Sequence, residues 1–142
     1  MRRFFRLLLV EDDIVRVQDF RSWCPSWAKL VWAQSARAAL ELIRRDVGRG
    51  YGGVLLDHDL GARAITTDDA SLSGTDVALA LVEHFSIDIP ILIHSTNLVQ
   101  VPQVTRLLES KGFWVTRMPY YDMTEVRFRR WLDEARDIWE EF

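Results

Sequence analysis

Cysteine is nearly absent from this sequence: Cys24 is the only one among 142 residues, so no disulfide can form within the chain. Such a chain suits a reducing compartment, and we expect a cytoplasmic location. The sequence also lacks a run of about 18 apolar residues, the length that a membrane-spanning helix needs. Its apolar start ends at Glu11, short of the roughly 7–15 apolar residues of a secretory signal. We therefore expect no membrane segment.

A strong charge of one sign is also missing. The chain has 18 basic and 21 acidic residues, which give a formal net charge of −3. The basic residues are scattered among the acidic ones, whereas nucleic-acid-binding domains concentrate positive charge. We therefore expect no nucleic-acid partner. The hydrophobic share of 49% and the charged share of 27% are typical of an ordinary globular domain.

What the sequence does have is a regular alternation of short apolar segments and amphipathic segments. The predicted strands are residues 6–10, 29–33, 53–57, 89–94 and 113–117. The predicted helices run over residues 13–23, 35–48 and 75–85, from Pro102 to Gly112, and from a capping pair at Asp122 and Glu125 to the end. This alternation predicts an α/β fold with helices on both faces of a doubly wound parallel sheet. We expect strand order 2-1-3-4-5 in a single domain over residues 1–142.

Polar residues follow four of the predicted strands at the point where each strand ends. Binding sites in such sheets lie at the carboxyl ends of the strands. The residues at these ends are Glu11, Asp12 and Asp13 after strand one, Asp57, His58 and Asp59 after strand three, His94, Ser95 and Asn97 after strand four, and Arg117 after strand five. We expect them to form one site.

Carboxylates should converge there, because strands one and three are neighbours in the predicted order. Glu11, Asp12 and Asp57 would repel one another unless a cation joined them. Oxygen ligands without cysteine favour Mg²⁺, so we expect Mg²⁺ at these three residues. The alternative interpretation is that the acids cap helices or turns, and for Asp13 we favour a helix cap.

Four segments of the chain resemble the two-component receiver domains. They are residues 8–13 (LLVEDD), 54–57 (VLLD), 72–76 (LSGTD) and 89–95 (IPILIHS). The resemblance implies a flavodoxin-like fold in which Glu11 and Asp12 hold Mg²⁺. It also implies that Asp57 accepts a phosphoryl group, whose oxygens are bound by Ser95 and a basic residue.

The chain departs from the usual receiver pattern at the ends of strands three, four and five. Receivers carry Lys-Pro after strand five, where this chain has Arg117, Met118 and Pro119. The residues after strands three and four look like those of cyclic-phosphate-processing receiver domains. That resemblance implies binding or hydrolysis of a nucleotide derivative that carries a cyclic phosphate.

This function gives each residue of the site an expected role. Asp57 would be the nucleophile and Asp59 an acid, and Ser95, Asn97 and Arg117 would bind phosphate. His58 and His94 have two interpretations, as an acid–base pair or as residues that pack at the ends of their strands.

Two other functions stay open. The chain could be a single-domain response regulator in which a histidine kinase phosphorylates Asp57. It could also be a degenerate receiver that binds a protein partner through Tyr120, Tyr121 and the last helix. The apolar stripe of that helix is better explained as core than as interface.

Overall fold

The computed structural model describes residues 4–57 and 73–141. The strands are β1 (Phe5–Val10), β2 (Ala28–Ala33), β3 (Gly53–Leu56), β4 (Ile91–Ile93) and β5 (Val115–Arg117). The helices are α1 (Ile14–Trp23), α2 (Ala36–Arg45), α4 (Gly74–His84), α5 (Gln100–Ser110) and α6 (Glu125–Glu140), with a short 3-10 helix, η1 (Tyr120–Asp122). Two of the predicted site residues, His58 and Asp59, lie outside the described residues.

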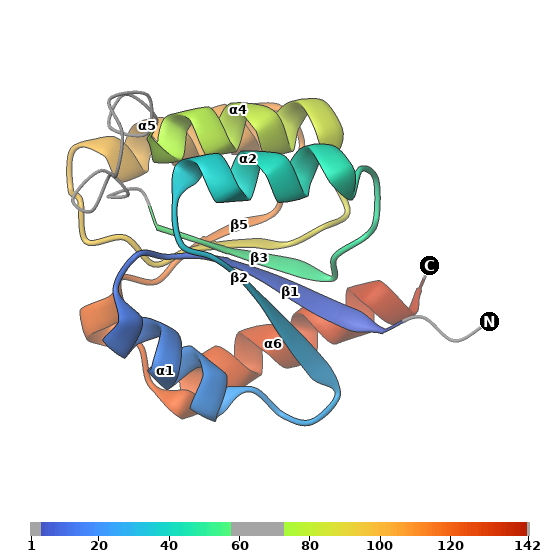
Figure 1. Cartoon of the computed structure of the whole chain (residues 1–142), viewed down its shortest axis with the longest axis vertical. Helices are drawn as coiled ribbons and strands as arrows, with labels where there is room; N and C mark the ends of the chain where they lie inside the picture. Colours follow the sequence, from blue (N-terminus) through green and yellow to red (C-terminus); the bar gives the residue numbers. More distant parts are fainter. Residues whose placement is uncertain (1–3, 58–72, 142) are drawn as a thin grey trace.

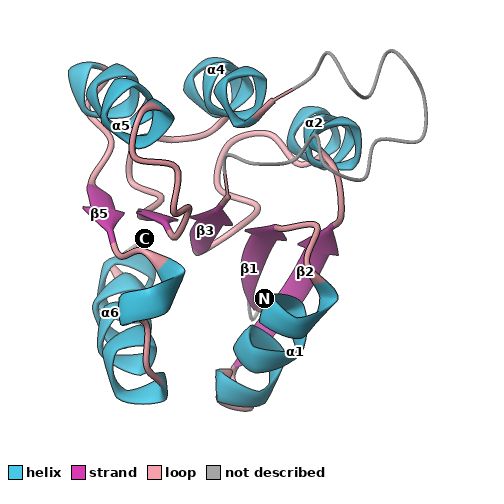
Figure 2. Ribbon diagram, turned by 90° about the vertical axis from the view of Figure 1, so that its left-hand side faces the viewer, coloured by secondary structure: helices cyan, strands magenta, loops and turns pink. Residues whose placement is uncertain are grey.

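The strands form a parallel sheet in the predicted order, β2-β1-β3-β4-β5. Helices α2, α4 and α5 cover one face of this sheet, and α1 and α6 cover the other (Figure 1, Figure 2). The two ends of the chain lie near the start of β1, away from the edge at which the strands end (Figure 1). The doubly wound α/β fold is thus confirmed.

The central strands are buried on both faces, which explains why their sequences are almost uninterrupted apolar runs. In β1, Leu8 and Val10 pack into the core under α2, α4 and α5, while Leu7 and Leu9 pack into the core against α1 and α6. Complete burial of each such side chain contributes about 1.5–3 kcal/mol. This packing fixes the register of β1 and β3, and with it the positions of the residues that come after them.

The start of α6 differs from the prediction. Asp122 was expected to cap this helix, but it belongs to η1, where its N–H donates to the carbonyl of Pro119 at 2.8 Å. The cap is Thr124, whose hydroxyl accepts the N–H of Arg127 at 3.2 Å. The 3-10 helix includes Asp122, so α6 begins after it, at Glu125.

The rest of the prediction for α6 is confirmed within the described residues. Its buried residues are Phe128, Trp131, Leu132 and Ala135. They pack into the core cluster on the α1 side of the sheet.

The expected helix ends at three other positions are confirmed. Asp13 caps α1, because its side chain accepts the N–H groups of Val15 and Arg16. Ser35 caps α2 in the same way. Gly112 follows α5 with φ of +96°, in the left-handed region that favours glycine.

Gly52 lies where a side chain has no room. A Cβ atom at this position would lie 2.2 Å from a ring carbon of Phe5. Phe5 is held by edge contacts with Trp27 and Trp139 at centroid distances of 5.2 and 5.7 Å. We expect Gly52→Ala to lower the free energy of unfolding by about 1–3 kcal/mol, as other overpacked cores do. Urea denaturation measures this loss.

Phe5→Leu provides the control for that result. In the Phe5→Leu background the aromatic ring is absent. There, Gly52→Ala should lower the free energy of unfolding clearly less than it does in the native chain. An equal loss in both backgrounds would show that the contact with Phe5 is not the cause.

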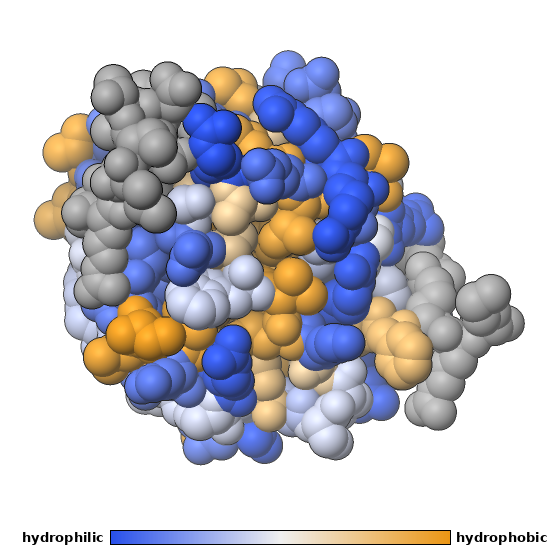
Figure 3. All heavy atoms as spheres, viewed as in Figure 1, coloured by the Kyte–Doolittle hydropathy of each residue, from blue (hydrophilic) through white to orange (hydrophobic). Residues whose placement is uncertain are grey.

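No helix in residues 4–57 or 73–141 combines the length and the apolar composition needed to cross a bilayer. Polar and apolar residues are interspersed on the face seen in Figure 3. Exposed large apolar side chains come from separate elements of the chain; examples are Phe4, Val15, Leu98 and Val126.

Candidate active site

Three polar side chains meet at the carboxyl edge of the sheet. Glu11, Asp57 and His94 each come directly after a strand: β1, β3 and β4 respectively. The sheet hydrogen bonds continue to them, since the N–H of Asp57 donates to Val10 at 3.0 Å and the N–H of His94 donates to Leu56 at 3.1 Å. All three residues are at most 2% exposed. Buried polar groups of this kind are costly unless they are paired, so the cluster calls for an explanation beyond packing.

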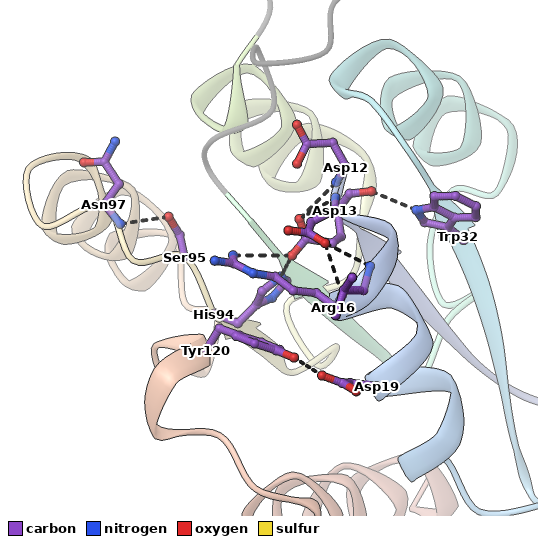
Figure 4. A network of polar contacts seen from close by, with 11 residues as sticks. Asp12, Asp13, Arg16, Asp19, Trp32, His94, Ser95, Asn97 and Tyr120 are labelled. Carbon is purple, nitrogen blue, oxygen red and sulfur yellow. Dashed lines mark hydrogen bonds and ion pairs between the residues drawn. The ribbon is translucent and has the colours of Figure 1, made fainter.

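Glu11 is the centre of this cluster. Its Oε2 accepts the N–H groups of Asp12 and Asp13 at 3.0 and 3.2 Å. Its Oε1 lies 2.9 Å from Nε2 of His94 and 3.6 Å from Nη1 of Arg16 (Figure 4). The contacts therefore hold the Glu11 carboxyl group in one orientation at the end of β1.

The main chain at Glu11 is fixed as well. Its carbonyl accepts the indole N–H of Trp32 at 2.8 Å, and its N–H donates to Ala33 at 3.1 Å. Both partners lie in β2, so the edge strand anchors the first residue of the site.

The electrostatics of Glu11 reflect its burial. Desolvation raises the pKa of this carboxyl group, and hydrogen bonds with Asp57 and Asp13 and the charge of Arg16 oppose the rise. Two carboxyl groups in hydrogen-bond contact must share a proton or a cation, because two adjacent charges repel each other. A proton or a cation therefore stabilises the pair of Glu11 and Asp57.

His94 is fully buried, and desolvation lowers its pKa to about 4 despite the nearby charge of Asp57. The imidazole is thus neutral near pH 7. When Glu11 is ionised, its carboxylate can only accept, so Nε2 of His94 carries the proton and donates it to Oε1. Nδ1 is buried without a hydrogen-bond partner among the described residues, and the ring of Phe20 packs against the imidazole at a centroid distance of 5.0 Å. In this geometry His94 acts on Glu11, and its predicted role in acid–base chemistry stays a prediction.

The cluster can hold a divalent cation. Glu11, Asp57 and His94 each offer one ligand atom, and these atoms lie within 4.8 Å of one another. Asp12, which was also expected to bind the metal, is half-buried and does not belong to this group of three. The sequence suggested oxygen ligands alone, and the structure places an imidazole beside them, whose Nε2 can bind a cation only when it does not donate to Glu11. Carboxylate oxygens suit Mn²⁺ as well as Mg²⁺.

Ser95 and Asn97 shape the turn between β4 and α5. The buried Ser95 hydroxyl accepts the N–H of Asn97 at 3.1 Å. The side-chain oxygen of Asn97 accepts the N–H groups of Val99 and Gln100 at 3.1 and 2.9 Å. Asn97 thereby holds the entry to α5. The contribution of both side chains to phosphate binding remains a prediction.

Arg117 is the last residue of β5 and lies beside α5. Its side chain is exposed and lines a groove between α5 and β5 with Thr105, Arg106 and Glu109. It forms no hydrogen bond or ion pair with a described residue. Met118, the next residue, points to the other face and packs against the core there. The structure thus gives no support to the grouping of Arg117 with Asp57.

Arg16 is the cation that reasoning from the sequence missed. It sits in the first turn of α1, three residues after the capping Asp13, and forms the ion pair with Glu11. A sequence signal for it exists, since side chains in a helix lean back toward its N-terminus. An arginine in the first turn after an acidic strand end can therefore reach that end.

A divalent cation should stabilise this protein by mass action, because it binds the folded site only. With Mg²⁺ or Mn²⁺ at 100 times the dissociation constant, the gain is about 2.7 kcal/mol. Asp57→Asn should reduce the metal-induced rise in melting temperature, whereas Asp133→Asn, an exposed change on α6, should leave it unaltered. Calorimetry that detects no divalent binding, with equal melting of Asp57→Asn with and without metal, would refute the metal site.

A parallel sheet of this order, with acids after its first and third strands, defines a receiver domain. The sequence matches the family model described as the cyclic-phosphate processing receiver domain over residues 7–110. The chain belongs to this family. No curated protein matches the sequence.

Solved receiver domains share the fold at low sequence identity. One is the signal receiver domain of an HD domain-containing protein from Pseudomonas fluorescens Pf-5, with a TM-score of 0.73 and 15% identity over 99% of this chain and 100% of that one. Another is a CheY-like receiver domain from Methanospirillum hungatei JF-1, with a TM-score of 0.70 and 13% identity over 98% and 99%.

A third similar structure contains a metal. It is the receiver domain of a sensor histidine kinase from Pseudomonas aeruginosa PAO1, with a magnesium ion coordinated in its active site cleft. Its TM-score is 0.67 and its identity 16%, over 92% of this chain and 96% of that one. At these identities the likeness shows the fold alone.

Proposed function

We propose that this chain binds a nucleotide derivative with a cyclic phosphate and hydrolyses it in a cation-dependent reaction. The observation that carries the proposal is the buried group of Glu11, Asp57 and His94 at the carboxyl edge of the sheet. The family description and the magnesium bound in a similar fold support it. We place the enzyme in the cytoplasm as a single domain over residues 1–142, in line with the sequence.

The residues have distinct parts in this proposal. Glu11, Asp57 and Asp12 would hold the cation. A bound Mg²⁺ would neutralise charge on the phosphate oxygens. Asp57 attacks phosphorus, one P–O bond of the ring breaks, and the departing oxygen takes a proton. Water then attacks the phosphoryl group on Asp57 and releases a phosphate monoester and the free carboxylate.

The proton for the departing oxygen needs a separate donor. Asp59, His58 and His94 are the sequence-based assignments for it, and the first two fall outside the described residues. His94 serves by holding Glu11, because its Nε2 is bonded to that carboxyl group and its ring is fully buried. Ser95 and Asn97 line the entry to α5 beside the cluster and would bind phosphate oxygens.

Phosphorus NMR tests the proposal. The protein is incubated with Mg²⁺ or Mn²⁺ and a panel of nucleoside 2′,3′-cyclic and 3′,5′-cyclic phosphates. We expect at least one cyclic phosphate to become a monoester, with no reaction when the metal is chelated. If none reacts with either metal, the proposed hydrolysis is wrong.

A second function is favoured by the position of Asp57 directly after β3 of a receiver fold. A histidine kinase could phosphorylate this residue in a signalling relay. In that case the phosphoryl group must persist on Asp57 long enough to be read. The two functions use the same carboxylate and differ in the lifetime of the phosphoryl group on it.

A further inference from the structure

A phosphate entering this site meets two buried acids, Glu11 and Asp57. Like charges repel strongly at such short range, so binding requires positive charge from the protein as well as from a metal. In the part of the chain that the structure describes, the ion pair to this cluster comes from Arg16, at 3.6 Å between Nη1 and Oε1 of Glu11. Arg16 also contributes to the electrostatic environment of both Glu11 and His94.

The guanidinium of Arg16 is held in place by Tyr120. Its Cζ lies 4.7 Å from the centroid of the Tyr120 ring, in a cation–π contact. Tyr120 is itself tied at two points: its N–H donates to the carbonyl of His94 at 2.9 Å, and its hydroxyl donates to Asp19 (Figure 4). The phenol stays protonated, because desolvation and Asp19 raise the pKa of Tyr120 to about 12. The arginine therefore loses little additional conformational entropy on binding a ligand.

The same guanidinium has donors that no described residue uses. Among the described residues its closest carboxylate oxygen is Oε1 of Glu11 at 3.6 Å, too far for a good hydrogen bond. Its N–H groups donate no hydrogen bond to any residue in 4–57 or 73–141, although the side chain is only 24% exposed. A half-buried arginine fork of this kind suits a phosphate, which it can bind through two parallel hydrogen bonds.

We infer that Arg16, and not Arg117, is the residue that binds the phosphate of the ligand. The inference rests on the proposed function, because it names the cation of the same site. Arg16 moves its guanidinium from the single ion pair with Glu11 to the phosphate oxygens, with Tyr120 as its support. The positive charge of the site is then supplied by α1, which follows β1, and not by the end of β5.

Isothermal titration with inorganic phosphate in Mg²⁺ buffer at low salt tests the inference. We expect Arg16→Gln to weaken phosphate binding at least tenfold, and Arg16→Lys to retain part of the affinity as a point charge without the fork. Arg21→Gln is the matched control, since it removes the same charge from the same helix at an exposed position. It should change the affinity less than twofold.

Mg²⁺ titration of the same variants separates ligand binding from damage to the site. Removing the positive charge of Arg16 should leave Mg²⁺ affinity equal or slightly higher, whereas a disrupted cluster would lose metal and phosphate together. That joint loss in Arg16→Gln and Arg16→Lys would overturn the inference.

Two further outcomes identify which claim has failed. If the native protein binds phosphate and Arg16→Gln does not weaken it, while Arg117→Gln does, Arg16 is not the phosphate ligand. If the native protein binds no phosphate in the presence of Mg²⁺, the proposed function itself loses its binding step.

Discussion

Asp57→Asn is expected to lower the turnover of a cyclic phosphate by about 10³-fold or more, because it removes the attacking carboxylate. Asparagine has nearly the same shape and is a far weaker nucleophile. The residue is buried at the end of β3, where its main-chain hydrogen bond to Val10 does not depend on the side chain. The loss should therefore appear in kcat.

Stability separates this chemical effect from misfolding. Without metal, Asp57→Asn should be at least as stable as the native chain, since the amide can donate to Glu11 where a second carboxylate would repel it. Steady-state kinetics and urea denaturation measure the two quantities. A variant that keeps native kcat would remove Asp57 from the mechanism, and a less stable apo protein would contradict the account of the Glu11–Asp57 pair.

His94→Phe has the second largest expected effect, a loss of about 10²-fold in turnover from a misplaced Glu11. The sequence alone suggests a different reason, in which His94 supplies an acid–base group and its loss costs about 10²–10⁴-fold. Phenylalanine fills the space beside Phe20 but cannot donate to Oε1 of Glu11. The buried carboxyl group then keeps only its other partners.

His94→Gln distinguishes the two explanations. Its amide nitrogen can reach the position of Nε2 and donate to Glu11, but it cannot transfer a proton near neutral pH. If His94 positions Glu11, glutamine should restore most of the activity that phenylalanine loses. Equal losses in both variants would show that the imidazole itself exchanges protons.

The fold could be predicted because its main determinants are local and repeated. Leu7 to Val10 and Val54 to Leu56 are continuous apolar runs, and a strand buried on both faces needs such a run. Short connections and right-handed crossovers then leave few strand orders. The same logic brought Glu11 and Asp57 together, because each comes directly after one of two neighbouring strands.

The contacts within the site were harder to predict, because they depend on where side chains point after the strands end. Continued alternation turns His94 to the same face as Leu92, toward Phe20 and α1, and a sequence does not show that Glu11 meets it there. Arg117, the last residue of β5, pairs with Ile93 of β4, and its side chain lines the groove beside α5. The contribution of Arg117 to phosphate binding therefore stays a prediction.

Arg16 escaped prediction for a related reason. A helix start offers several side chains, and only the packing of α1 against Tyr120 shows which one reaches Glu11. Asp122 shows the opposite error: it was expected to cap α6, but it belongs to the 3-10 helix before it. Both depend on contacts between α1, η1 and α6 that are distant in sequence.

Mass spectrometry of the protein and its small molecules in one Mg²⁺ incubation tests the central claim most directly. The native chain and Asp57→Asn are each mixed with the panel of cyclic phosphates and, separately, with acetyl phosphate. The account predicts that the native chain converts a cyclic phosphate to its monoester and holds no lasting phosphoryl group, and that Asp57→Asn does neither. Stable phosphorylation of Asp57 by acetyl phosphate, with every cyclic phosphate left intact, would contradict it and make the chain a signalling receiver.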